Sequence, residues 1–193
     1  MTAVILLGPP AVGKGTQATA LATYLGVPTI STGQIFRTNI EEGTELGRLA
    51  EEYMSAGKFV PDSVTISMVD ARLSAPDAHN GFILDGFPRN LPQAHALRDL
   101  LAKRGVPLDV VLEFTAPDDV VVERLLNRAQ QENRSDDREE VFVQRLADYH
   151  DQTEPIATYY ADQDLLEVVD AQGTIDEVRA AMIEVFESKG LGK

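Results

Sequence analysis

The chain has 193 residues, of which 44% are hydrophobic and 25% are charged. This length and composition are typical of one globular domain with a substantial core. The formal net charge is −14 at pH 7, so most of the surface repels nucleic acid and anionic membranes, and we expect neither as a partner. The chain has no cysteine, which excludes disulfides, thiolate catalysis and cysteine-ligated zinc.

The first residues lead straight into an apolar strand. No basic region precedes that strand, and no apolar run anywhere in the sequence approaches the ~20 residues that a membrane span needs. The sequence therefore predicts neither a signal peptide nor a membrane helix, and it favours a cytoplasmic location.

A glycine-rich loop follows this strand. Residues 3–7 are apolar, residues 8–16 read Gly-Pro-Pro-Ala-Val-Gly-Lys-Gly-Thr, and residues 17–25 resume as a helical pattern. Strand, loop and helix in this order indicate a phosphate-binding P-loop, in which backbone N–H groups surround an anion and Lys14 adds a positive charge. We expect a nucleotide polyphosphate as the ligand. The alternative is a purely structural turn between a strand and a helix.

The loop departs from the general pattern at two positions. Gly15 stands where a serine or threonine usually holds Mg²⁺, with Thr16 one place later, so any metal is held partly through water and by acids elsewhere. Ala11 stands where related loops usually have a glycine. If this position needs a positive φ, alanine costs about 1 kcal/mol or more.

The remaining sequence alternates apolar strands with helical patterns. Strands are expected within 27–33 and over 81–85, 110–115 and 165–170, and helices over 34–42, 45–56, 62–73, 91–104, 118–126, 138–162 and 174–188. The fold class is therefore α/β, a three-layer sandwich with a central parallel sheet covered by helices on both faces. Ligands bind beyond the carboxyl ends of such strands, where the sequence places Gly8, Thr32, Asp85 and Gly173.

Two segments do not fit the core pattern. Residues 31–60 carry little continuous apolar sequence and indicate a small helical excursion from a single domain spanning residues 1–193. Residues 127–137 are the most hydrophilic stretch, which predicts a mobile loop or short lid between two helices.

Five motifs in order now carry a family resemblance. They are Gly-Pro-Pro-x-x-Gly-Lys-Gly-Thr-Gln at 8–17, Ser-Thr-Gly-x-x-x-Arg at 31–37, Gly-Lys-x-Val-Pro-Asp at 57–62, Leu-Asp-Gly-Phe-Pro-Arg at 84–89 with Gln93, and Arg-Ser-Asp-Asp at 134–137. Over essentially its whole length the sequence resembles adenylate kinases of the short-lid bacterial form. The resemblance implies reversible, Mg²⁺-dependent transfer of the terminal phosphoryl group of ATP to AMP, giving two ADP.

The resemblance also implies which residues contact each nucleotide. For ATP, these are Ala11, Val12, Gly13, Lys14, Gly15, Thr16, Arg128 and Gly173. For AMP, they are Thr32, Arg37, Lys58, Phe59, Val60, Gly86, Phe87, Pro88, Arg89, Gln93, Arg134 and Arg145.

Phosphoryl transfer requires mainly positioning and charge neutralisation. The residues expected to act in catalysis are Lys14, Asp85, Arg89, Arg128, Arg134 and Arg145. Asp85 is the expected metal-organising acid, which would hold Mg²⁺ through water. The alternatives are a helix or turn cap for Asp85, and a solvated helix face or a surface ion pair for any single arginine.

The base preference rests on Gln93, whose amide both donates and accepts and so matches the edge of adenine. In the similar uridylate and cytidylate kinases, the residue matching Gln93 looks like asparagine, and the residue matching Thr32 is typically alanine. A kinase for another nucleoside monophosphate is therefore the nearest alternative. A nucleotide sensor without efficient turnover is a second one, motivated by Ala11 and by Gln34, which stands at a position commonly acidic in relatives.

The resemblance implies no structural zinc, because the lid is short. We further expect a monomer, because the chain supplies its whole site.

Overall fold

A computed structural model describes residues 2–132 and 139–192, with the side chains of 128–132, 139 and 140 left aside. Its centre is a five-stranded sheet in the order β2-β3-β1-β4-β5, and every neighbouring pair is parallel. The strands are β1 (Thr2–Leu7), β2 (Thr29–Ser31), β3 (Gly81–Asp85), β4 (Val110–Thr115) and β5 (Leu166–Asp170). Because β3 and β4 lie on opposite sides of β1, the strand order reverses there, which places a ligand site beyond the carboxyl end of β1.

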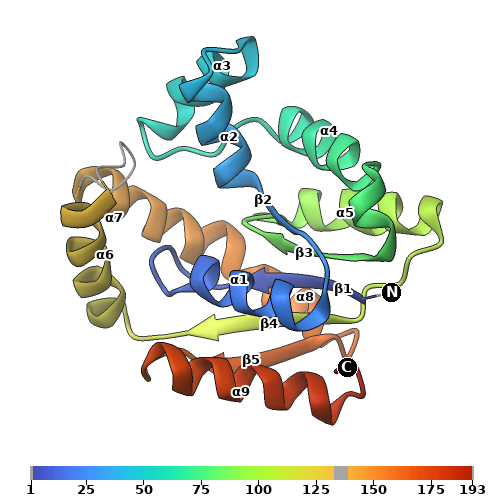
Figure 1. The fold of residues 1–193 in the computed structure, drawn as a ribbon. Helices are drawn as coiled ribbons and strands as arrows, with labels where there is room; N and C mark the ends of the chain where they lie inside the picture. The colour runs from blue at the N-terminus through green and yellow to red at the C-terminus, as the bar shows by residue number, and fades with distance from the viewer. Residues whose placement is uncertain (1, 133–138, 193) are drawn as a thin grey trace.

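Helices surround the sheet (Figure 1). They are α1 (Lys14–Leu25), α2 (Thr32–Glu41), α3 (Glu45–Met54), α4 (Asp62–Leu73), α5 (Leu91–Arg104), α6 (Asp118–Glu132), α7 (Glu139–Asp148), α8 (Glu154–Ala161) and α9 (Ile175–Ser188). A short 3₁₀ helix spans Pro76–Asn80. Among the described residues, no helix combines the length and the apolar character needed to cross a bilayer.

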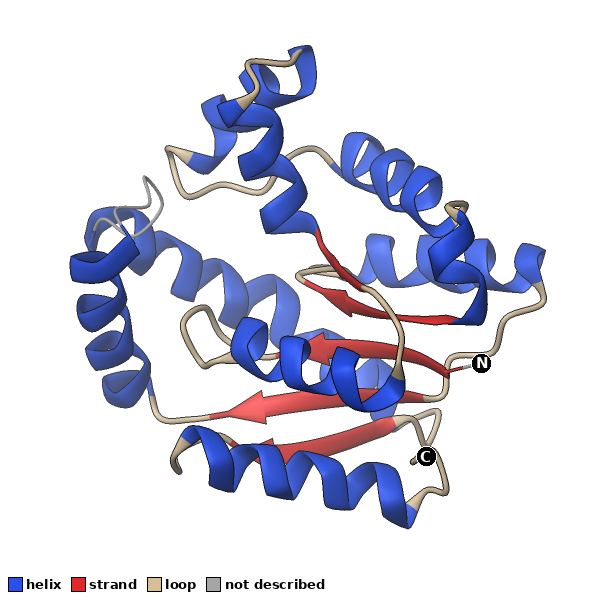
Figure 2. Cartoon of the chain, in the orientation of Figure 1, coloured by secondary structure: helices blue, strands red, loops and turns tan. Residues whose placement is uncertain are grey.

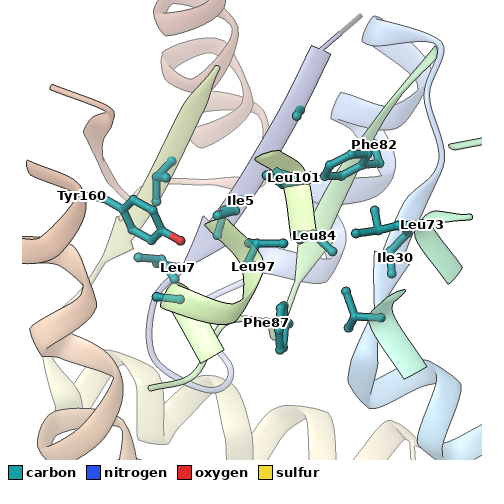
Figure 3. Close-up of a cluster of buried hydrophobic side chains, with 14 of the residues drawn as sticks. Ile5, Leu7, Ile30, Leu73, Phe82, Leu84, Phe87, Leu97, Leu101 and Tyr160 are labelled. Carbon is teal, nitrogen blue, oxygen red and sulfur yellow. The ribbon is translucent and has the colours of Figure 1, made fainter. Parts of the chain in front are cut away.

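The core occupies both faces of the sheet because side chains of β1 alternate between them. Ile5 packs with Leu97 of α5 and Tyr160 of α8 on one face, as Figure 3 shows. Leu6 packs with Leu21 of α1 and Met182 of α9 on the other. The predicted α/β sandwich with a parallel sheet is confirmed.

Local sequence explains where several helices begin and end. The Asn90 side chain caps α5 by accepting from the N–H of Gln93, and Gly105 ends that helix in the left-handed conformation. Thr174 and Glu177 form a reciprocal capping box at the start of α9. These caps fix the ends of the elements that carry the loops above the sheet.

The strand arrows in Figure 2 point toward the side of the molecule where α6 and α7 lie. At the top of the view α2 and α3, which follow β2 directly, extend beyond the sheet, with a small apolar cluster of their own around Phe36, Ala50 and Val60. The carboxyl ends of the strands are therefore flanked by two helical projections.

Two helix boundaries differ from the sequence prediction. The hydrophilic stretch expected as a loop from residue 127 is helical as far as Glu132, because arginine, alanine, glutamine and glutamate favour a helix even without an apolar face. The long helix expected over 138–162 is interrupted by a π-helical turn, Tyr149–Thr153. Pro155 follows that turn, and its ring excludes the regular bond to the carbonyl four residues earlier.

Candidate active site

The loop after β1 has the conformation that a phosphate-binding loop requires. Gly8 has a φ of 138°, and a Cβ there would lie 2.5 Å from the carbonyl oxygen of Phe114. Gly13 has a φ of 108° and precedes α1, whose first turn has no side-chain cap. The Lys14 Nζ donates to the carbonyls of Gly8 at 2.7 Å and Pro9 at 2.8 Å. The ammonium group therefore lies across the loop, beside the open N-terminus of α1.

Ala11 has a φ of 63°, which is the left-handed region. The sequence left open whether this alanine was strained or took an ordinary dihedral, and the structure supports strain. Its methyl group packs against the cluster of Val121, Leu125 and Phe142, which partly offsets the backbone cost.

A cleft of about 940 Å³ opens above the carboxyl ends of the strands and includes this loop. In the described part of the chain its lining contains one acidic side chain, Asp85, and several basic ones. The basic lining residues are Lys14, Arg37, Arg89, Arg124 and Arg145. In a protein of net charge −14, this gathering of cations makes the cleft a local anion site.

A smaller cavity of about 40 Å³ adjoins the cleft between α2, the 57–60 segment and the start of α5. It brings together nine of the twelve residues expected at AMP. They are Thr32, Arg37, Lys58, Phe59, Val60, Gly86, Arg89, Gln93 and Arg145. Pro88 lines the large cleft instead, whereas the Phe87 side chain is fully buried in the core beside Leu84.

Hydrogen bonds organise the wall between the two cavities. The carbonyl of Gly86 accepts from Thr32 Oγ1 at 2.8 Å and from Arg89 Nε at 2.8 Å. The Arg89 guanidinium lies 5.3 Å from the centre of the Phe59 ring, and a cation in this position is attracted to the ring face. These contacts hold Arg89 at the boundary between the cleft and the small cavity.

Asp85 ends β3 and accepts a hydrogen bond of 3.2 Å from Ser31 Oγ. No cluster of three or more histidines and acids that could enclose a metal occurs in the described residues. A single carboxylate in a cleft fits Mg²⁺, which is held in nucleotide enzymes by one or two carboxylates together with substrate phosphates and water. Asp85 is therefore suited to bind magnesium only together with a nucleotide.

The π-helical turn forms the floor of the cleft through Tyr149 and Thr153. Thr153 Oγ1 donates to the carbonyl of Arg89 at 2.8 Å, so the turn is tied to the small cavity. Burial raises the pKa of the Tyr149 hydroxyl, and burial also raises the pKa of Glu113 on β4. Both groups therefore favour their neutral forms more than they do in water.

Comparison with known proteins decides the family. The family model for adenylate kinase matches residues 6–165. A protein of Thermobifida fusca named adenylate kinase is 50% identical over 186 residues, covering 96% of this chain and 98% of the relative. An adenylate kinase of Mycobacterium bovis is 51% identical over 183 residues, covering 95% and 98%. One of Mycolicibacterium paratuberculosis is 54% identical over 177 residues, covering 92% and 94%.

The chain belongs to the adenylate kinase family. Members are nucleoside monophosphate kinases, so the predicted family, fold and enzyme class are confirmed. The roles of single residues stay predictions.

Two of the arginines that the resemblance implied are not placed by the structure. The Arg128 side chain and all of Arg134 lie outside the described residues, as does the Arg-Ser-Asp-Asp motif. Arg145 is half-buried on α7 and lines both cavities.

Arg124 lines the cleft, and the sequence reasoning missed it. Its guanidinium donates to the carbonyl of Val12 at 3.0 Å and to those of Gln172 and Gly173 at 3.4 Å. It thereby joins the phosphate loop to the segment predicted to contact the ATP base. One signal was available in the sequence, because Arg124 stands four residues before Arg128, a spacing at which residues of a helix are neighbours on one face.

Gln34 lies within reach of Arg37 at the start of α2. Its Oε1 accepts from the Arg37 guanidinium at 3.3 Å, and its Nε2 donates to Thr38 Oγ1 at 3.4 Å. An amide here forms a hydrogen bond to the arginine without neutralising its charge.

Proposed function

We propose that the protein catalyses the reversible, Mg²⁺-dependent reaction of ATP and AMP to two ADP, as an adenylate kinase that maintains the balance of adenine nucleotides. The observation that carries this proposal is the joining of two cavities, one at a phosphate loop and one with an adenine-compatible amide, by shared basic side chains. Two nucleotides bound there would meet with their phosphates between Lys14, Arg89 and Arg145.

Lys14 and the loop amides from Ala11 to Thr16 would hold the ATP phosphates, and Gly173 would approach the ATP base. Arg37 and Arg89 would bind the AMP phosphate in planar, bidentate contacts. This arrangement places the attacking and leaving oxygens and neutralises the charge on the transferred group, which is most of what phosphoryl transfer needs. Arg128, Arg134 and Arg145 would complete it from the lid side.

Magnesium would be held by Asp85 through water and by the nucleotide phosphates, which suits a site with one carboxylate. When bound, the ion neutralises phosphate charge and orients the phosphates for in-line transfer. Asp85 would fix the position of its water shell, with Ser31 holding the carboxylate in place.

The helical excursion 31–60 and the lid at 127–137 are proposed to close over the two nucleotides. Closure would exclude water, because an open site would allow ATP hydrolysis in place of transfer. The excursion carries its own small core around Phe36, Ala50 and Val60, which supports movement as a unit. A monomer in the cytoplasm is part of the same proposal, and light scattering after gel filtration tests the monomer.

A coupled assay of ADP formation from ATP and Mg²⁺ tests the function, with AMP, UMP, CMP and GMP offered separately. We expect strong activity with AMP alone. Preference for another base would assign the chain to a different monophosphate specificity. Tight ATP binding without transfer to any acceptor would favour a nucleotide sensor and direct attention to Ala11 and Gln34.

Replacing Lys14 with alanine tests the role of the loop. We expect the Lys14→Ala variant to lose about 100-fold or more in kcat, because a preorganised charge on the transferred group is removed. Its circular dichroism should match that of the parent protein. Lys103→Ala, which changes an exposed lysine on α5, is the matched control and should keep full activity. Normal turnover in Lys14→Ala would remove the loop from the mechanism.

A further inference from the structure

The amide of Gln93 is held at both ends by the protein itself. Gln93 is 1% exposed and lines the small cavity. Its Oε1 accepts from the backbone N–H of Arg89 at 2.8 Å, and its Nε2 donates to Asp62 Oδ1 at 2.6 Å. A planar amide has two N–H groups and two carbonyl lone pairs. One of each therefore remains for a ligand.

Asp62 belongs to a different element and is 31 residues away in sequence. It is the first residue of α4, and its carboxylate also accepts from Asn90 Nδ2 at 3.0 Å and 3.2 Å. Asn90 in turn accepts from the backbone N–H of Gln93 at 2.9 Å. Asp62, Asn90 and Gln93 thus form a closed set of hydrogen bonds behind the cavity wall. Among the described residues, Asp62 lines neither cavity.

These partners leave the Gln93 amide one orientation. A carboxylate offers only acceptors, so the Asp62 side can take only the NH₂ end of the amide. A backbone N–H only donates, so the Arg89 side can take only the oxygen end. Rotating the amide by 180° would bring oxygen against carboxylate and NH₂ against N–H, and it would lose both bonds in a buried site.

The fixed orientation matters because adenine and the 6-oxopurines present opposite patterns of hydrogen-bond donors and acceptors on the same edge of the ring. Adenine offers an acceptor at N1 beside a donor at the 6-amino group. A 6-oxopurine offers a donor at N1 beside an acceptor at O6. An amide that cannot rotate can match only one of these edges, and mismatched polar groups in a buried site are strongly disfavoured.

We propose that Asp62 is a positioning residue that makes the acceptor site select adenine over 6-oxopurines, by fixing the orientation of the Gln93 amide. The inference rests on the proposed function of the small cavity as the AMP site. Asp62 acts through Gln93 and Asn90 and not by touching the nucleotide.

The Asp62→Asn variant tests this inference with AMP and IMP as acceptors. IMP differs from AMP only at the edge in question. Asparagine keeps the shape of aspartate but can both donate and accept, so a rotated Gln93 amide would then be opposed only by the backbone N–H of Arg89. We expect the ratio of kcat/KM for AMP to that for IMP to fall about tenfold or more. Most of the change should be in the KM for the monophosphate, with the KM for ATP unchanged.

Two further variants separate positioning from a loss of structure. Asp99→Asn changes an exposed aspartate on α5 and should leave the ratio unaltered. Asp62→Ala should lower the ratio in the parent protein but not in a Gln93→Ala background, because the amide that it positions is then absent. Thermal unfolding of every variant checks that the fold is retained.

The outcomes distinguish this inference from the proposed function. A parent protein that does not phosphorylate AMP would overturn both. A parent protein active on AMP, combined with an Asp62→Asn variant of unchanged AMP to IMP ratio, would overturn only the role of Asp62. An equal loss with AMP and IMP would also overturn it, because that result indicates a general structural role.

Discussion

Ala11 shows how one residue combines backbone strain with packing. Its φ of 63° costs roughly 1–2 kcal/mol for a residue with a Cβ. Burial of its methyl group against the Val121 cluster returns at most about 0.8 kcal/mol. We therefore expect Ala11→Gly to raise the free energy of unfolding by about 0.5–1 kcal/mol in urea titrations.

A clear destabilisation of Ala11→Gly would contradict this estimate and would mean that methyl packing outweighs the strain.

The nearby Gly13 provides the reverse test. Its φ of 108° disfavours any side chain, so Gly13→Ala should lower the free energy of unfolding even though no atom lies close enough to clash.

Sequence alone found cleft residues that belong to a local motif and missed those whose contacts are distant in the sequence. Lys14 could be predicted because its spacing from the glycines defines the loop. Arg124 was missed, because its partners are backbone carbonyls 112, 48 and 49 residues away and only its spacing from Arg128 pointed to it. The bond from Asp62 to Gln93 joins two helices and leaves no pattern in the sequence. A sequence motif identifies a residue of the site, whereas the hydrogen-bond partners of that residue depend on tertiary packing.

The crossing of α2 and α3 depends on Gly47. A Cβ at this position would lie 2.0 Å from the carbonyl oxygen of Asn39, so the two helix backbones would have to move apart. We expect Gly47→Ala to lower the free energy of unfolding by about 2 kcal/mol. We also expect a higher KM for AMP and an unchanged KM for ATP, because only the excursion would shift.

Glu52→Ala is the control for Gly47→Ala because it changes an exposed position on the same helix. Its effect on stability should stay within about 0.5 kcal/mol. Equal changes in the KM values for ATP and AMP in Gly47→Ala would contradict a movement confined to α2 and α3.

His150 links three elements at the base of the lid helices. From the π-helical turn, its Nδ1 lies 2.9 Å from Glu154 of α8 and its Nε2 lies 3.3 Å from Asp118 of α6. The hydrogen bond to Glu154, with a smaller contribution from Asp118, raises the pKa of His150 above its ordinary value of 6.5. The charged imidazole is therefore favoured in the folded protein.

Because the pKa of His150 is raised in the folded protein, the free energy of unfolding depends on pH. Because the folded pKa exceeds the unfolded one, the contribution of His150 is fully present below pH 6.5 and is lost as the pH rises through the folded pKa. We expect His150→Gln to be less stable than the parent protein at low pH, by about 0.5 kcal/mol because the pair is exposed. The difference should vanish at higher pH. Urea unfolding across this range measures it, and a constant difference would contradict the assignment.

At the scale of elements, apolar runs predicted the strands well because each strand is buried on both faces. The helix ends were harder to predict. The extension of α6 to Glu132 consists mostly of polar residues with good helix propensity, so polarity alone misassigned it to a loop. The π-helical turn depends on Pro155, which cannot donate to the carbonyl four residues earlier. The periodicity of apolar side chains does not show such a missing backbone bond.

At the scale of the whole molecule, charge is divided between the surface and the cleft. The chain carries 31 acidic and 17 basic residues, yet the described lining of the cleft has several basic side chains and a single acid. The surface of the fold is correspondingly depleted of positive charge. Long-range repulsion therefore acts on the folded protein, while the cleft remains attractive to polyphosphates at short range.

This imbalance predicts that salt stabilises the fold. Described ion pairs such as Arg98 with Asp99 are exposed and contribute about 0–1 kcal/mol each, so screening costs little where charges attract. Net repulsion extends further and is screened strongly, because the Debye length falls from about 30 Å at 0.01 M to about 10 Å at 0.1 M salt. We expect sodium chloride to raise Tm, mostly at concentrations below about 0.1 M. Each kcal/mol gained in the free energy of unfolding should raise Tm by about 2–4 °C. Potassium chloride should act equally. A falling Tm would mean that local ion pairs outweigh the net charge.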